Sequence, residues 1–208
     1  MNEFNFLLRN RSSEFASPSL PVSLESLNCT NDPAYIEFIK SFNGGMFFDQ
    51  SLQIYGCSKD LETLSLEEIN QKMTKEYGQL VAKLFFFACD AFGNQFCFDL
   101  RTSRIKFFNL ESAHQEFIAN EFIGWIQIVN SDIDYYTGRP FVIRWEKFML
   151  PLHNDERLTA KIPFVVGGAY EMGNLRCEKL GTIIEFSSSI AKQIFELPDG
   201  TPIDIKLE

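Results

Sequence analysis

The sequence predicts an α+β fold in which a mostly antiparallel, twisted sheet forms a meander that is flanked by helices. The sheet is indicated by two neighbouring runs, an apolar and aromatic one at 83–89 and an alternating one at 95–100. The short turn at 90–93 between them makes the pair a hairpin with one face on the core. The helices are indicated by apolar residues that recur with helical spacing behind capping residues.

The composition is that of a folded and acidic chain. Among 208 residues, 28 Asp and Glu outnumber 19 Lys and Arg, which gives a formal net charge of −9 at pH 7. This sign argues against binding to nucleic acid, whose phosphates need basic side chains, and against binding to an anionic membrane surface. The 22 phenylalanines either fill an aromatic core or line, in part, a groove for a partner.

Three further features of the sequence concern the compartment. No apolar stretch approaches the ~20 residues that are needed to cross a bilayer. The N-terminus lacks the pattern of a signal peptide. The five cysteines are odd in number and scattered, so no disulfide framework is expected. Together these features predict a cytoplasmic protein.

The chain before the sheet is predicted to contain an arm and one capped helix. Residues 1–24 show no clean period and are rich in Ser and Pro, which predicts a loop or an arm laid over the domain. Asp32, or the Asn before it, can cap a helix over 33–42. This helix is predicted to end at the Asn-Gly-Gly motif of 43–45, because glycine readily takes the left-handed backbone that terminates helices.

A capped helix and several strands are predicted around the hairpin. Two short strands, at 46–48 and 52–55, come first. Ser65 and Glu68 form a capping box, which begins a helix that runs to Tyr77. After the hairpin, a strand at 105–108 is predicted to continue the meander.

A long helix and a differently textured C-terminal segment are predicted next. Ser112 can cap a helix to about Val129, whose apolar stripe includes Phe117 and Trp125. The segment after it is predicted to begin with a loop at 132–140 and a strand at 141–148. A polar irregular stretch at 151–162 and a short buried strand at 163–166 are predicted to follow. A helix at 187–197 and a last strand at 203–207 are predicted to complete it.

These elements suggest three parts that together make one compact domain. Residues 1–24 are the arm, residues 25–130 an α+β core, and residues 131–208 a C-terminal extension packed on the core.

Motifs for catalysis, for metal binding and for cofactor binding are missing. Neither histidine has a partner at metal-ligand spacing, and the chain contains no phosphate loop, zinc motif or nucleophile elbow. Cys89 and Cys97 flank the hairpin turn and are interpreted as small core residues, with a metal or redox pair as the alternative. A Cys–His nucleophile stays open, because such partners need only be close in space. The sequence therefore predicts a protein without enzymatic activity, cofactor or metal.

Several motifs of the first 130 residues occur in a characteristic order. They are Tyr-Ile-Glu-Phe-Ile at 35–39, Asn-Gly-Gly at 43–45, the acidic hairpin turn at 90–93 and Phe-Ile-Gly-Trp at 122–125. This order resembles the SUKH superfamily, whose best-known branch is named after a fungal cell-wall-synthesis regulator. Bacterial members look mostly like immunity proteins of polymorphic toxin systems. The resemblance implies a SUKH-like α+β fold and a binding role, and it supplies no catalytic residue.

The C-terminal segment is similar to an extension of some bacterial members. The shared motifs are Tyr-Thr-Gly at 136–138, Pro-Phe-Val-Val-Gly-Gly at 163–168, Asn-Leu at 174–175 and Leu-Pro-Asp-Gly-Thr at 197–201. The resemblance therefore covers residues 31–208. The hairpin turn departs from the family pattern, because Ala91 and Phe92 stand where small or polar residues are commoner.

The family motifs supply a set of positions that are interpreted as structural. Their glycines are predicted to end helices or to allow tight turns and bulges, and direct contact with a partner is the alternative. The positions are Asn43, Gly44, Gly45, Asp90, Gly93, Gly167, Gly168, Asp199 and Gly200.

The first hypothesis for the function is a cytoplasmic immunity protein that neutralises a cognate toxin domain by direct binding. A basic toxin such as a nuclease fits best, since an acidic face speeds association with a cationic cleft. The candidate contact residues are Asp60, Glu62, Glu67 and Glu68. The same acids also suit a solvated helix start, where they complement the helix dipole.

Two other functions remain open from the sequence. One is a regulatory or scaffold module of the cell-wall-regulator type, and the other is a small-ligand-binding protein or enzyme with an aromatic pocket. The sequence leaves the oligomeric state open.

Overall fold

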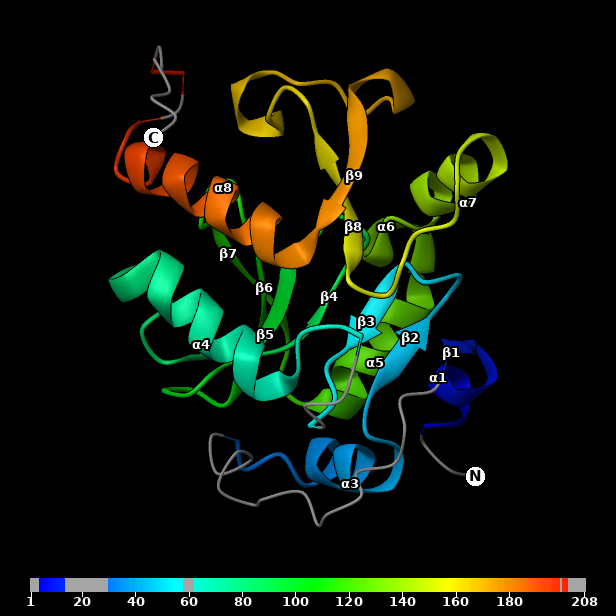
Figure 1. Ribbon diagram of the computed structural model, residues 1–208. Coiled ribbons are helices and arrows are strands. Elements are labelled where there is room, and N and C mark those ends of the chain that lie inside the picture. Colours follow the sequence, from blue (N-terminus) through cyan, green and yellow to red (C-terminus); the bar gives the residue numbers. More distant parts are fainter. Residues whose placement is uncertain (1–3, 14–29, 58–61, 199, 202–208) are drawn as a thin grey trace.

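Seven strands form one antiparallel sheet in which each strand pairs with the next strand in sequence (Figure 1). The computed structural model describes residues 4–13, 30–57, 62–198 and 200–201. From edge to edge the strands are β1 (Arg11–Ser13), β2 (Gly45–Phe47), β3 (Leu52–Ile54), β4 (Leu84–Cys89), β5 (Gln95–Asp99), β6 (Arg104–Phe108) and β7 (Gln115–Ala119). This order confirms the predicted α+β fold with its meander.

Helices pack on both faces of the sheet. The helices of the described residues are α1 (Asn5–Arg9), α3 (Pro33–Phe42), α4 (Leu66–Tyr77), α5 (Phe122–Ser131), α6 (Ile133–Thr137), α7 (Arg139–Phe148) and α8 (Leu180–Ile194). Neighbouring residues of β4 show the two faces, since side chains of a strand alternate. Phe87 packs edge-on against Trp125 of α5, whereas Phe86 packs against Phe108, which in turn contacts Tyr77 of α4.

The predicted start and end of α3 are confirmed by local hydrogen bonds. The Asp32 carboxylate accepts a hydrogen bond from the backbone N–H of Tyr35, at 3.0 Å. Asn43 ends the helix in the left-handed conformation, with φ 51°. The next residue, Gly44, continues with φ 75° and turns the chain into β2.

Most phenylalanines of the sheet and of the helices that cover it lie in one aromatic core. Those that are at most 1% exposed are Phe38, Phe47, Phe86, Phe87, Phe96, Phe98, Phe108 and Phe122. Burial of each such side chain stabilises the fold by roughly 1.5–3 kcal/mol relative to exposure. The aromatic-core interpretation therefore holds for these residues.

The predicted long helix over 112–129 is wrong. Its first part is strand β7, at the edge of the sheet, and α5 begins only at Phe122. Phe117, which was expected in the helix's apolar stripe, is 52% exposed on β7. The apolar residues of β7 and α5 match a helical spacing by coincidence. Ala113 has φ 56° and turns the chain back, so that β7 pairs with β6.

The predicted strand over 141–148 is also wrong, because residues 139–148 form α7. Pro140 lies in its first turn, where the missing N–H costs nothing. Val142 and Trp145, three residues apart, are buried, whereas Ile143 is 45% exposed. The apolar residues therefore follow the helical period.

The last part of the chain differs from the prediction in three further places. Residues within the predicted irregular stretch form β8 (Glu156–Ala160), which pairs with β9 (Leu175–Lys179) in a second, two-stranded sheet. The predicted buried strand at 163–166 is a 3-10 turn, η2 (Phe164–Val166), without a buried residue. Helix α8 begins seven residues earlier than expected, at Leu180, and the strand predicted at 203–207 lies outside the described residues.

The turn of the β4–β5 hairpin connects the first 131 residues with those that follow. The N–H of Ala91 donates a hydrogen bond to the carbonyl of Thr137, at 3.0 Å, and the carbonyl of Ala91 accepts one from the N–H of Leu158, at 2.9 Å. Helix α8 packs beside α4 (Figure 1). The division into arm, core and extension stays a prediction. Among the described helices, none has both the length and the apolar character that a membrane crossing requires.

Candidate functional site

The first turn of α4 and the loop before it carry the described acids of the predicted contact surface. Glu62, Glu67 and Glu68 are all exposed. We call these three residues the α4 surface. Asp60, the fourth predicted residue, lies outside the described part of the chain.

Glu68 has a structural role within this surface. Its carboxylate accepts hydrogen bonds from the backbone N–H and the hydroxyl of Ser65, at 2.8 and 2.7 Å. The Ser65 hydroxyl in turn accepts one from the Glu68 N–H, at 3.3 Å. This capping box satisfies N–H groups that the helix leaves without partners. Glu62 and Glu67 are therefore the better candidates for contact with a partner.

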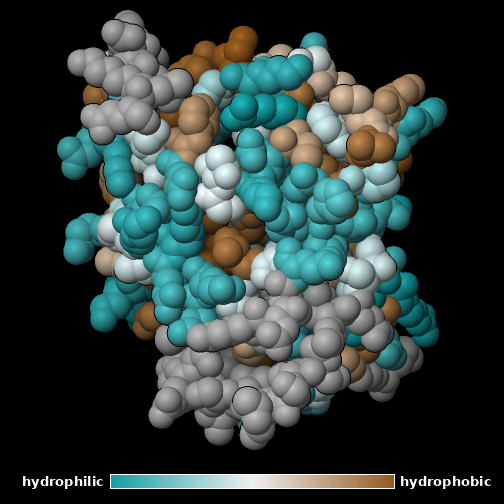
Figure 2. All heavy atoms as spheres, viewed as in Figure 1, coloured by the Kyte–Doolittle hydropathy of each residue, from teal (hydrophilic) through white to brown (hydrophobic). Residues whose placement is uncertain are grey.

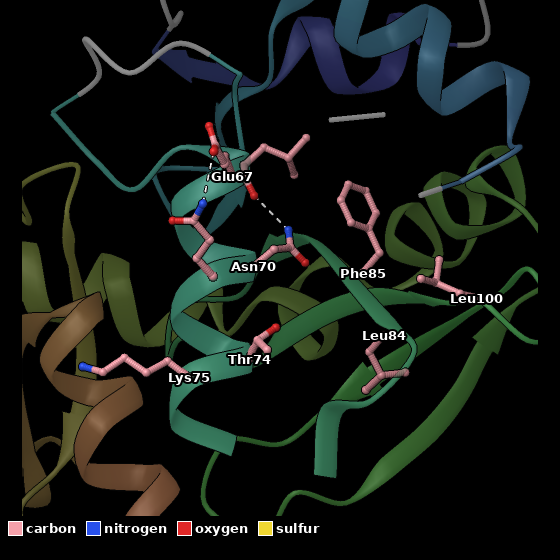
Figure 3. A pocket seen from close by; sticks show the side chains of 9 residues that line it. Glu67, Asn70, Thr74, Lys75, Leu84, Phe85 and Leu100 are labelled. Carbon is pink, nitrogen blue, oxygen red and sulfur yellow. Dashed lines mark hydrogen bonds between the residues drawn. The ribbon is translucent and has the colours of Figure 1, made fainter. Parts of the chain in front are cut away.

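A groove of about 570 Å³ lies between α4 and the start of β4 (Figure 3). Its apolar lining comes from Leu66, Leu84, Phe85 and Leu100. Glu67 stands on its rim and accepts a hydrogen bond from the Gln71 side chain, at 3.1 Å. The sequence predicted Glu67 as a contact residue but did not predict the apolar residues that line the groove. The one available signal was Leu100, which ends the alternating run and is 38% exposed.

Asn70 fixes the wall of this groove to the sheet. Strand β3 pairs only with the last two residues of β4, so the peptide groups of Phe86 lie beyond its end. The Asn70 side chain replaces the missing strand: its oxygen accepts from the Phe86 N–H, at 2.9 Å, and its nitrogen donates to the Phe86 carbonyl, at 2.8 Å. The groove is thus held between two rigid elements.

A second, polar groove of about 430 Å³ lies on the other side of α4, against the start of α8. Glu62 and Glu68 line it together with two ion pairs, Lys72 with Glu185 and Lys179 with Asp155. Figure 2 shows that hydrophilic side chains cover most of this face, with a small hydrophobic area between α4 and the start of α8. The first turn of α4 therefore separates an apolar groove from a charged one.

The family-motif residues near α3 point inward. Asn43 is 1% exposed, and its side-chain oxygen accepts a hydrogen bond from the N–H of Cys57, at 2.8 Å. A Cβ atom on Gly44 would overlap the carbonyl oxygen of Ile54. Gly45 lies within β2, where its neighbour is the Arg11 side chain. This geometry favours a structural role for the motif over direct contact with a partner.

The remaining motif residues lie in turns. Gly93, Gly167 and Gly200 have φ of 82°, 94° and 80°. Gly168 has its backbone against the carbonyl of Ile162. Asp199 lies outside the described residues.

Asp90 organises the hairpin turn from a buried position. One carboxylate oxygen accepts from the N–H groups of Phe92 and Asn94, both at 2.8 Å, and the other accepts from the Asn94 side chain, at 3.0 Å. Burial raises the pKa of Asp90 from its ordinary value of 3.8 to about 7, although these hydrogen bonds and the positive charge of Arg157 act to lower it.

The raised pKa of Asp90 predicts a specific pH dependence of stability. Between pH 4 and 7 the native state holds a proton that the unfolded state has lost, so the contribution of Asp90 is complete below pH 4 and is lost by pH 7. At about 1.4 kcal/mol per pKa unit, the loss is about 4 kcal/mol. Urea denaturation measures the free energy of unfolding of wild type and of Asp90→Asn at each pH. The value for wild type minus the value for Asp90→Asn should fall by about 4 kcal/mol between pH 4 and 7.

An exposed acid provides the control for this measurement. Glu37→Gln on α3 should show no such difference across the same pH range. A difference between wild type and Asp90→Asn that rises with pH would contradict the prediction.

Comparison with known proteins connects this geometry with a family. The fold is shared with a solved structure, the crystal structure of Atu4351 from Agrobacterium tumefaciens, at a TM-score of 0.65 and 14% sequence identity. The match covers 90% of this chain and 87% of that chain, so the likeness in fold extends beyond the meander. At this identity it shows the fold alone.

The family model described as SMI1-KNR4 cell-wall, SUKH_6, matches residues 26–126. These residues hold strands β2 to β7, helices α3 and α4, and the start of α5. The part of the chain at residues 26–126 therefore belongs to the SUKH superfamily, which confirms the resemblance seen in its motifs. No curated protein matches the chain.

Proposed function

We propose that this chain is a non-catalytic binding protein that neutralises a cognate bacterial toxin in the cytoplasm by direct binding through the α4 surface. The superfamily is generally non-catalytic, and its bacterial members resemble immunity proteins. One observation supports the choice of surface: Glu67 stands on the rim of an apolar groove lined by β4 and by Leu100, and Glu62 lies in the adjoining polar groove.

The apolar groove and its rim match the anatomy of protein interfaces. Stable interfaces combine an apolar centre with a polar rim. Leu84, Phe85 and Leu100 supply the apolar centre, and Glu67 supplies a negative charge on the rim. Lys75, which also lines the groove, forms an ion pair with Glu76 at 3.2 Å. Carboxylates in that position attract a basic partner, raise the association rate and exclude partners of like charge. A basic nuclease is one toxin that fits this chemistry.

A regulatory or scaffold module of the cell-wall-regulator type is the second candidate. It is favoured by the description of the matching family, SMI1-KNR4 cell-wall. Such a module would use the same surface for a housekeeping protein. The identity of the partner separates the two functions.

The test begins with the neighbouring genes: if one of them encodes a large secreted protein, its C-terminal domain is the toxin domain to use. Co-expression of the full chain should restore growth to cells that make this domain, and calorimetry with the purified proteins should detect a complex. The double variant Glu62→Lys/Glu67→Lys should weaken binding by about 100-fold, roughly tenfold for each reversed charge, which corresponds to about 1.4 kcal/mol each.

Glu37→Lys is the matched control, because it reverses an exposed charge on α3 and should leave both growth and affinity unchanged. Cells that die despite stable wild-type protein would overturn the immunity function. Full protection by the double variant with unchanged affinity would overturn the assignment to the α4 surface.

A further inference from the structure

A cavity of about 310 Å³ lies at the hairpin turn, on the face of the sheet opposite to α4. The consecutive residues Phe107 and Phe108 of β6 show the two sides: Phe108 packs against Tyr77 of α4, whereas Phe107 lines the cavity. Its walls are the hairpin turn, β6, β7, α6, the start of α7 and Tyr170. None of the residues that line it belongs to the α4 surface or its grooves. We call this cavity the aromatic pocket.

Six aromatic side chains line the aromatic pocket. They are Phe92, Phe107, Tyr135, Tyr136, Phe141 and Tyr170. Their positions are fixed by ring contacts. Phe92 packs edge-on against Phe141 and Tyr170, with centroids 5.3 and 5.9 Å apart, and Phe164 stacks on Tyr170 at 3.8 Å. The faces of such rings carry a negative quadrupole that attracts cations.

The charged residues that line the aromatic pocket are all acidic. Asp90, Glu116 and Asp134 line it, and no Lys, Arg or His is among the described residues that do so. The nearby Arg139 pairs with Asp49 at 2.7 Å and lies 3.9 Å from the outer carboxylate, Asp134. Burial and then the neighbouring Tyr135, Glu116 and Asp132 raise the pKa of Tyr136, as expected in a negative environment.

The size and the opening of the pocket restrict the ligand. Its volume is at the lower end of the range of ~300–1,000 Å³ for small-molecule sites, which suits one side chain. Tyr135 is 73% exposed and Tyr170 55%, so the mouth is open and the backbone of a bound chain can remain outside. A metal ion fits poorly, since aromatic rings are not metal ligands and the described residues contain no group of three metal-ligating side chains.

We propose that the aromatic pocket binds one arginine side chain of a protein partner. The planar guanidinium stacks on aromatic faces, is more weakly hydrated than the lysine ammonium, and donates hydrogen bonds to carboxylates. Glu116 and Asp134 at the mouth supply such carboxylates. The aromatic pocket is a second binding site, separate from the α4 surface, and its occupancy does not depend on the identity of the toxin.

The test measures binding of small arginine derivatives to the full chain by NMR. N-acetyl-arginine amide should bind with millimolar affinity and shift the backbone amides of the hairpin turn and of α6. N-acetyl-citrulline amide, which has the same shape without the charge, should bind at least about tenfold more weakly, as expected for a cation–π and ionic contact. Free arginine should also bind more weakly, because the acids of the pocket repel its carboxylate.

Two matched double variants complete the test. Glu116→Gln/Asp134→Asn, at exposed positions, should weaken binding of the arginine amide by about tenfold, whereas Glu62→Gln/Glu67→Gln should leave it unchanged, since distant exposed charges are screened. Equal binding of the citrulline compound, or unchanged binding to the pocket variant, would overturn the proposal. Equal or tighter binding of free arginine would overturn the proposal that the bound arginine side chain belongs to a protein partner.

Discussion

Replacement of Arg157 by Ala is expected to lower the free energy of unfolding by about 3–5 kcal/mol, because it removes a large buried side chain together with its hydrogen bonds. Arg157 lies in β8 and is only 1% exposed. Its guanidinium donates hydrogen bonds to the side-chain oxygen of Gln53 in β3 and to the carbonyl of Asn154, the latter at 3.1 Å. Truncation leaves the buried Gln53 oxygen with only the weak donor Cys89 Sγ, at 3.8 Å, and opens a cavity.

The electrostatic surroundings add to this effect. No carboxylate in the described part of the chain forms an ion pair with Arg157. Its positive charge nevertheless lowers the pKa of the buried Asp90, so the two charges stabilise each other across the junction of the two sheets. Arg157→Ala should therefore raise the pKa of Asp90 further.

Urea denaturation at neutral pH measures the first effect. Arg144→Ala, on the exposed side of α7, is the matched control and should change stability by less than about 0.5 kcal/mol. Hydrogen exchange should show that the amides of β8 lose protection first. A loss of less than about 1 kcal/mol in Arg157→Ala would contradict the role assigned to this side chain.

Replacement of Gly44 by Ala is expected to destabilise the protein by about 3–5 kcal/mol, from left-handed strain and steric overlap together. Gly44 has φ 75°, and its Cβ would overlap the Ile54 carbonyl oxygen and lie 2.9 Å from the carbonyl carbon of Tyr55. Both atoms belong to backbone that the sheet holds in place. At 2–4 °C for each kcal/mol in a chain of this size, the melting temperature should fall by about 10 °C.

Gly167→Ala separates the strain from the overlap. Gly167 also has a positive φ, of 94°, but nothing lies within 4 Å of its Cβ position. This variant should cost only about 1–2 kcal/mol. Equal losses of stability in the two variants would show that the overlap with Ile54 does not contribute to the destabilisation.

The parts of the fold that could be predicted from the sequence depend on local interactions. The capping box of Ser65 and Glu68, the left-handed end of α3 and the aromatic hairpin are each determined within a few residues. Strand β7 could not be predicted, because its pairing with β6 is a tertiary interaction and its apolar residues match a helical spacing with those of α5. Strand β8 was missed for a related reason: its polar Arg157 is buried by partners on a distant strand.

The same distinction applies to the candidate site. The acids of α4 follow from the sequence, since helix starts attract acidic residues and expose them. The apolar floor beside them needs β4 and β5, which approach α4 only in the folded chain. The aromatic pocket combines five separate segments, and no local pattern joins them. Its one trace in the sequence is Phe92, which departs from the family pattern at the hairpin turn.

Phe92 also limits how the chain can be divided. A fragment that ended after α5 would keep the whole meander but would lose Phe141, Phe164 and Tyr170, the rings that surround Phe92. It would also lose both backbone partners of Ala91. In such a fragment the Phe92 ring would be exposed at the tip of the hairpin and would promote self-association. The isolated meander is therefore expected to aggregate unless position 92 is made polar.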